Sequence, residues 1–235
     1  MNRLFTTAAL LCALSLGFTS CSKDDDKVEQ VEPEYQAKVM VKDGETVDLT
    51  KVSKTVNTQG TIKRTGNTYS LRNFKQFTIG EDGKATATAS ADYYFDFKEN
   101  DATSDADKML SLSGTAAVTL KTNTEKGYTL SYIDKSFDQV QASDQLISIE
   151  NNASEIYKMI IPPATERIRT ESGWCNYSMV NHIVTVVENR TLVISKDKKP
   201  LFKIRMNSIY SDGKPNASEK ASNMVFYSID YQEFK

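Results

Sequence analysis

The feature that most constrains the fold of this chain is a period-two alternation of apolar and polar residues near its C-terminal end. Residues 201–210 place Phe202, Ile204 and Met206 on one face, and residues 225–231 repeat the pattern. Successive side chains of a strand point to opposite faces of a sheet. Two half-buried strands are therefore expected here, with Met206 in the core.

The same signal recurs from residue 35 onwards, where short runs rich in Thr, Val, Ile, Tyr and Phe lie between Gly, Asn and Asp clusters. The other expected strands are 38–41, 61–63, 69–71, 74–79, 85–89, 93–97, 110–113, 116–121, 128–133, 183–187 and 191–195. Hairpin turns are expected at 123–127 and at Glu188-Asn189. One short helix is expected at 151–159, with Asn151 as its cap and two prolines after it. The predicted fold class is all-β, with predominantly antiparallel sheets and one short helix.

Residues 1–20 have the organisation of a secretory signal peptide. Arg3 gives a positive start, and the apolar run 4–18 is too short to span a bilayer. The small residues followed by Cys21 resemble the lipobox of bacterial lipoproteins, in which the cysteine becomes the first residue and carries acyl chains. We therefore expect lipidation at Cys21. Several acyl chains together give stable anchoring, because each buried methylene contributes roughly 0.8 kcal/mol.

Residues 21–35 are expected to form an acidic, disordered tether. Residues 23–34 contain six acidic residues and two lysines but few apolar side chains, so they cannot build a core. A plain solvated linker is one interpretation. The aspartates directly after Cys21 also resemble the export signal that sends Bacteroidetes lipoproteins to the outer leaflet of the outer membrane. The expected location is the outer membrane, lipid-anchored and surface-exposed, with release from the cell as an open alternative.

The net charge and the motifs of the sequence argue against several classes of function. A net charge of −2 and an acidic pI argue against nucleic acid and against a polybasic membrane patch, so the lipid anchor is the only expected membrane contact. Cys175 is left without a disulfide partner and is expected to be a buried core thiol. His182 is the single histidine, and nucleophile-elbow, zinc-protease, Cys-x-x-Cys and nucleotide-loop motifs are all missing from the sequence. The chain is predicted not to be an enzyme, and the distant carboxylate pair of a glycosidase stays a minor alternative.

A set of ordered segments carries a family resemblance. Residues 173–182 are Gly-Trp-Cys-Asn-Tyr-Ser-Met-Val-Asn-His, and they precede a strand starting at Arg190, then Phe-Lys-Ile-Arg at 202–205 and a Tyr/Phe-rich final strand. Upstream lie Tyr-Tyr-Phe-Asp-Phe at 93–97 and Lys-Ser-Phe-Asp-Gln-Val at 135–140. In this order the segments resemble the HmuY family of Bacteroidetes surface lipoproteins over residues 91–235. Residues 36–90 are then an N-terminal β extension.

The resemblance implies a hemophore-like β-sandwich that takes up heme outside the cell. It would pass heme to an outer-membrane TonB-dependent receptor for iron acquisition. In that family two axial side chains hold the heme iron, both His in some members and both Met in others. With His182 alone, two histidine ligands are impossible within one chain. The position matching the second ligand holds Met179, and Met159 is the methionine that precedes the Gly-Trp pair in the loop-rich interval. Thioether pairs favour ferrous iron.

Competing interpretations stay open for each residue. Met179 is an axial ligand or a packing residue, Met159 lies in an apolar run that also suits a core, and His182 can replace either as ligand. Trp174 and Tyr177 suit both a porphyrin and a core. The alternative function is an HmuY-like interaction module that has lost heme and binds another ligand or a receptor. The length of 36–90 and the missing Trp-Asp pair of the family favour that alternative.

Overall fold

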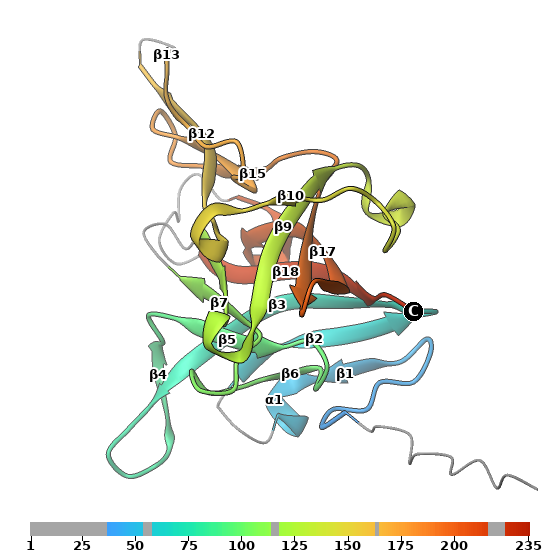
Figure 1. Cartoon of the computed structure of the whole chain (residues 1–235). Helices are drawn as coiled ribbons and strands as arrows, with labels where there is room; N and C mark the ends of the chain where they lie inside the picture. Colours follow the sequence, from blue (N-terminus) through green and yellow to red (C-terminus); the bar gives the residue numbers. More distant parts are fainter. Residues whose placement is uncertain (1–36, 54–57, 114–117, 163–164, 216–223) are drawn as a thin grey trace, which may run out of the picture. The chain divides into compact units, whose positions relative to one another are not determined.

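The computed structural model describes residues 37–53, 58–113, 118–162, 165–215 and 224–235, and Gln36–Lys235 form one compact unit. Strands dominate this part of the chain, which confirms the predicted all-β class (Figure 1). The predicted leader 1–20, Cys21 and the tether 21–35 lie outside the described residues. Among the described helices, none is long and apolar enough to cross a membrane.

The largest sheet has nine strands in the described residues, and all its neighbouring strands are antiparallel. In spatial order they are β1 (Thr46–Asp48), β2 (Thr58–Thr65), β3 (Thr68–Ile79), β18 (Met224–Glu233), β17 (Lys199–Tyr210), β16 (Arg190–Lys196), β9 (Tyr128–Asp134) and β10 (Ile147–Ser148), while β4 (Ala85–Ala89) pairs with β3. Because β3 pairs with β18, the first strands of the unit continue the sheet formed by the last ones.

Two smaller sheets complete the described architecture. The five-stranded sheet has the order β11 (Ala153–Ser154), β8 (Thr119–Thr122), β7 (Leu110–Ser113), β5 (Tyr93–Asp96), β6 (Asp101–Ala102). The four-stranded sheet has the order β13 (Thr165–Arg169), β12 (Ile156–Ile161), β14 (Cys175–Ser178), β15 (Val184–Val186). Its β12 and β14 run parallel, while its other pairs are antiparallel. Short 3-10 turns are η2 (Thr124–Lys126), η3 (Phe137–Gln139), η4 (Glu150–Asn152) and η5 (Ser211–Gly213).

The α-helix of the described chain is α1 (Leu49–Val52), where Asp48 caps the backbone N–H of Thr50 at 3.0 Å. The helix predicted at 151–159 is wrong. Asn151 and Asn152 have φ angles of 55° and 52°, which ends η4 after one turn. The following residues, rich in isoleucine, pair as β11 and β12 instead, because β-branched side chains pack well on a pleated surface.

An aromatic cluster joins the nine-stranded and five-stranded sheets. Phe74 of β3 meets Phe95 of β5 with ring centroids 5.3 Å apart, and Tyr231 of β18 meets Phe97 at 4.8 Å, both edge-to-face. This is the geometry that aromatic pairs prefer. The Tyr231 hydroxyl donates to Asn100 Oδ1 at 2.7 Å, which satisfies its one polar group inside the core. Burial raises the pKa of Tyr231 well above its ordinary value.

The C-terminal alternation is confirmed, because Phe202, Ile204 and Met206 are all buried. Cys175 is also fully buried, as expected for a core thiol, and burial raises the pKa of its thiol. The opposite face of β17 is covered in part as well. Lys203 is 5% exposed and donates through Nζ to the carbonyl oxygen of Phe137 at 2.9 Å, so desolvation lowers its pKa.

Three sequence predictions of local structure are wrong. Residues 123–127 join two sheets instead of closing a hairpin, because β8 pairs with β7 and β11 while β9 pairs with β16 and β10. Glu188-Asn189 likewise connects β15 of the four-stranded sheet to β16 of the nine-stranded sheet. Residues 38–41 form no strand, although Val39 donates to the carbonyl oxygen of Glu99 at 3.1 Å. Turn residues set a chain reversal, but long-range packing chooses the partner strand.

A buried carboxylate ties three strands together on the outer face of the nine-stranded sheet. Asp230 of β18 is 3% exposed and accepts hydrogen bonds from Arg205 Nη2 at 2.7 Å and Ser70 Oγ at 2.8 Å. Arg72 Nη2 donates to Oδ1, the oxygen that also accepts from Ser70, while Arg205 binds Oδ2. Burial alone would favour the protonated acid, but the hydrogen bond from Arg205 and the charge of Arg72 outweigh it and lower the pKa of Asp230.

We predict that Asp230→Asn weakens the acid sensitivity of the fold. The pKa of Asp230 is lower in the folded than in the unfolded protein, where it is about 4, so ionised Asp230 stabilises the fold above pH about 4. This stabilisation is lost as the pH falls through the pKa of the folded state. At pH 7 the variant should lose about 1.5–3 kcal/mol of unfolding free energy. Below pH about 4 the gap to the parent should shrink.

Urea unfolding at a series of pH values measures this gap. The matched control is Asp82→Asn, at an exposed turn carboxylate, and it should leave the stability at pH 7 within about 0.5 kcal/mol of the parent. A gap for Asp230→Asn that stays constant from pH 7 to pH 3 would contradict the assignment.

Candidate functional site

The four-stranded sheet projects beyond the ends of β9 and β10 and is anchored at its base (Figure 1). Trp174, which precedes β14, is 2% exposed and donates its indole N–H to the carbonyl oxygen of Val118. Trp174 is therefore a core residue.

At Gly173, an added Cβ would lie 2.1 Å from the backbone nitrogen of Tyr157, so only glycine allows this approach of two backbones.

Arg190 links this base to the nine-stranded sheet. Its Nε and Nη2 donate to the carboxylate of Asp134 on β9 at 2.7 and 2.9 Å. Its Nη1 donates to the carbonyl oxygens of Glu171 and Gly173 at 2.8 and 2.7 Å. The side chain is 5% exposed. Four of the five N–H donors of the guanidinium are used in this way, so Arg190 is a structural clamp.

Aromatic rings enclose the same guanidinium. Its central carbon lies 4.3 Å from the ring centre of Tyr132 on β9 and 4.9 Å from that of Tyr157 on β12. A cation held over aromatic faces gains more when it is desolvated than at the surface. Arg190 thus contacts both sheets through its charge and through its planar faces.

Met159 and Met179 belong to neighbouring segments of the four-stranded sheet. Met159 of β12 is paired with Tyr177 of β14, and the backbone N–H of Met179, in the turn after β14, donates to the carbonyl oxygen of Ile160 at 2.8 Å. Paired residues of adjacent strands share a face, so Met159 and Tyr177 face the same side. Met179 is 40% exposed and Met159 is half-buried.

His182 belongs to the same end of the sheet. Ser178 N–H donates to the carbonyl oxygen of Ile183 at 2.9 Å, so Met179 opens and His182 closes the turn between β14 and β15. His182 has a φ of 57° and is exposed. Its Nδ1 lies 2.9 Å from the hydroxyl of Tyr177. We call Met159, Met179, His182 and Tyr177 the Met-His cluster.

All three ligand candidates from the sequence thus lie on neighbouring segments of the four-stranded sheet. Met159 is only half-buried, so packing in the central core does not account for it. Tyr177 is half-buried and hydrogen-bonded to the histidine, a contact that no sequence pattern indicated. Whether Met159, Met179 or His182 binds iron stays a prediction.

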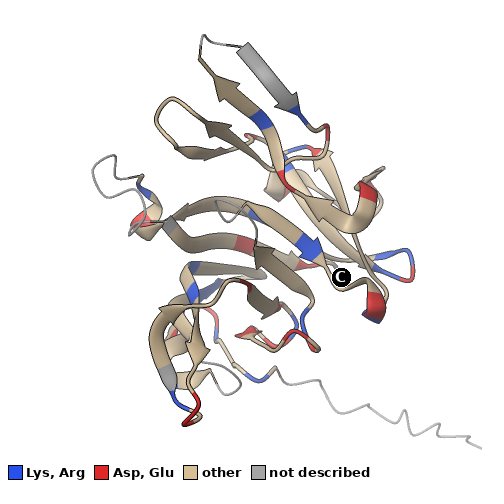
Figure 2. Cartoon of the chain, turned by 90° about the vertical axis from the view of Figure 1, so that its left-hand side faces the viewer, with Lys and Arg blue, Asp and Glu red and all other residues tan. Residues whose placement is uncertain are grey.

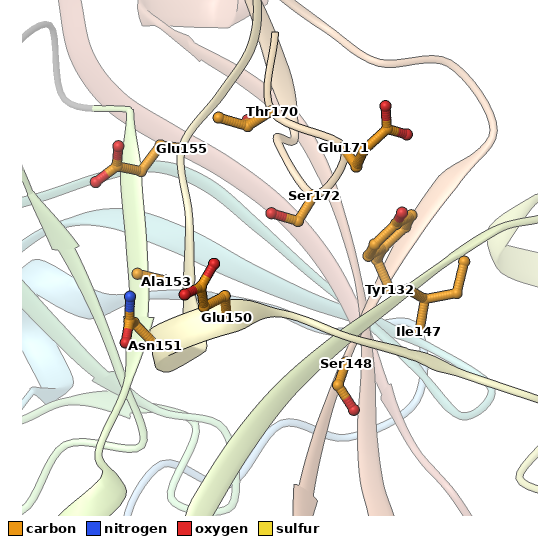
Figure 3. Close-up of a pocket in the computed structure, with 10 residues that line it drawn as sticks. All are labelled: Tyr132, Ile147, Ser148, Glu150, Asn151, Ala153, Glu155, Thr170, Glu171 and Ser172. Atoms are coloured by element: carbon orange, nitrogen blue, oxygen red, sulfur yellow. The ribbon is translucent and has the colours of Figure 1, made fainter.

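A separate pocket of about 520 Å³ lies beside the base of the sheet (Figure 3). Its lining residues are Tyr132, Ile147, Ser148, Glu150, Asn151, Ala153, Glu155, Thr170, Glu171 and Ser172. Three glutamates from separate segments surround it, and no residue of the Met-His cluster lines it. Sequence reasoning missed this pocket, because the short β10, η4 and β11 segments carry little hydrophobic alternation.

In Figure 2 the positions of Lys and Arg lie interspersed with those of Asp and Glu along the described elements. Within the described residues, no three His, Cys, Asp or Glu side chains are grouped so that they could hold a metal ion.

No protein-family model matches the chain, and comparisons with curated proteins and with solved structures find no match. The likeness to the HmuY family therefore rests on the order and composition of the sequence segments described above.

We predict that Arg190→Lys destabilises the fold by about 1.5–3 kcal/mol, because lysine keeps the charge but cannot reproduce the fork of donors to Asp134 and two carbonyls. Urea unfolding measures the change. Arg169→Lys is the matched control. Arg169 also lies over the Tyr157 ring, but its side chain is exposed to solvent. The control should change stability by less than about 0.5 kcal/mol. Equal effects of the two substitutions would contradict the clamp.

Proposed function

We propose that this chain is a non-enzymatic, lipid-anchored surface protein that binds heme through Met179 and Met159 and passes it to an outer-membrane TonB-dependent receptor. The observation that carries the proposal is that the two methionines lie on neighbouring, hydrogen-bonded backbone segments of the four-stranded sheet. Thioether sulfur is a soft donor and a known type of heme ligand.

The register supports two sulfurs on one iron. Met159 is paired with Tyr177, and Met179 follows β14 with its N–H bonded to the carbonyl oxygen of Ile160, the residue after Met159. The two methionines are therefore held on neighbouring backbone segments. Methionine side chains are long and flexible, so both thioether sulfurs would be available to one heme iron from these segments.

The exposure of the site suits a cargo that is taken up and released. Met179 is 40% exposed and the neighbouring Val180 is 64% exposed, so an apolar ligand can reach them from solvent. Two neutral thioethers do not compensate the extra charge of ferric iron, and binding should therefore favour the ferrous state. The proposed lipid anchor at Cys21 and the acidic segment after it would hold such a domain where extracellular heme is met.

A second function, an interaction module without heme, is favoured by one observation. The pocket of Figure 3 carries Glu150, Glu155 and Glu171 and contains no methionine or histidine. Its carboxylates would repel heme propionates, so its chemistry suits a cationic or polar partner instead. A chain that stays colourless with heme but binds a purified receptor would favour this function over heme uptake.

The heme proposal predicts a Soret shift when dithionite-reduced heme is titrated into the purified full chain carrying Cys12→Ser and Cys21→Ser. Met179→Ala should weaken binding at least 10-fold and change the Soret maximum, because one axial ligand is lost. Met159→Ala should do the same.

Met40→Ala is the matched control, since Met40 is 60% exposed and lies outside the four-stranded sheet. It should bind heme as the parent does. A parent spectrum without any shift, or one that is unchanged in Met179→Ala, would overturn the proposal.

A further inference from the structure

The Met-His cluster holds three side chains that donate to soft metal ions. Met179 and His182 stand at the two ends of one turn, and Tyr177 contacts His182 while pairing with Met159 on the neighbouring strand. Tyr177 is thus the common neighbour of all three donors. Donors that surround one tyrosine in this way can bind a small ion without a macrocycle between them.

The turn geometry separates this arrangement from axial ligation of heme. Residues at the two ends of a tight turn have Cα atoms less than about 7 Å apart. A porphyrin plane between Met179 and His182 would collide with the turn itself, so these two cannot be trans ligands. They can be cis ligands of a bare ion.

We propose that Met159, Met179 and His182 form a binding site for a monovalent soft cation, Cu(I). Thioether sulfur selects Cu(I) over hard cations, and imidazole is a common copper ligand. The donors are uncharged, which suits a monovalent ion better than a divalent one. This inference does not rest on heme binding, because it uses His182 and requires no porphyrin.

Tyr177 is the positioning residue of the site. A ligating histidine usually donates its other ring N–H to a neighbour, which fixes its tautomer. His182 Nδ1 lies 2.9 Å from the Tyr177 hydroxyl. In the tautomer whose Nδ1–H donates to that hydroxyl, Nε2 carries the lone pair that would bind the metal. Exposure of Met179 and His182 leaves the entry open.

The first test is competition for Cu(I) against bicinchoninate under ascorbate, using the full chain with Cys12→Ser and Cys21→Ser so that no thiol of the leader or tether competes. Cys175 stays in place because it is fully buried. The chain should withdraw one Cu(I) per molecule. Met179→Ala and His182→Ala should each lower the affinity at least 10-fold, and Tyr177→Phe by about 10-fold.

The second test follows the histidine ring by NMR with Ag(I), a redox-inert probe of the same class. His182 is the only histidine of the chain, so its ring signals assign themselves. Ag(I) should shift the Nε2 resonance in the parent and in the control Met40→Ala, with a smaller shift in Met179→Ala.

Uptake that is equal in the parent, Met179→Ala and His182→Ala, or a His182 ring that does not respond to Ag(I), would overturn the copper site. Heme binding without Cu(I) uptake would overturn this inference and leave the proposed function standing. Cu(I) uptake without a Soret shift would support the copper site and overturn the heme proposal.

Discussion

The buried guanidinium of Arg190 is the interaction on which the position of the candidate site depends. It binds Asp134 on one side and the carbonyl oxygens of Glu171 and Gly173 on the other, so it joins the nine-stranded sheet to the segment that leads into β14. The packing of Trp174 and the hydrogen bond from Val184 N–H to the Tyr210 hydroxyl at 2.6 Å also attach the four-stranded sheet. An arginine suits this position because its planar fork satisfies acceptors in several directions at once.

The four-stranded sheet can project because the rest of the unit supplies a large core. Edge-to-face aromatic contacts join β3, β5 and β18, and the strands from both ends of the unit share one sheet. The glycine at 173 lets β14 start directly against β12. That close start sets the parallel register, and the register places Met159 beside Tyr177. Backbone packing at the base therefore decides which side chains meet at the tip.

The sequence predicts the strands well where alternation is strong. Residues 85–89 and 110–113 match β4 and β7, and Met206 is in the core. It fails where local signals compete with tertiary pairing. Asn151 resembles a helix cap but takes a left-handed conformation, and the turns at 123–127 and Glu188-Asn189 link different sheets. Pairing partners are chosen by long-range burial, which single-sequence periodicity does not encode.

For the candidate site too, the sequence indicates some features and leaves others to the fold. Met159, Met179 and His182 are candidates from their residue types and from the family resemblance, but their convergence depends on the parallel pairing of β12 with β14. The Tyr177–His182 contact depends on the turn between β14 and β15, and the acidic pocket is formed by short segments with a weak pattern. Residue chemistry is visible in the sequence, whereas geometry appears only with the fold.

The most direct measurement is NMR of the full chain with ¹³C-labelled methionine methyl groups during titration with ferrous heme. The account predicts that the methyl signals of Met159 and Met179 move strongly upfield together, because axial ligands lie over the porphyrin ring, while those of Met40 and Met206 stay in place. A shift of neither Met159 nor Met179, or a shift confined to other methionines, would contradict it.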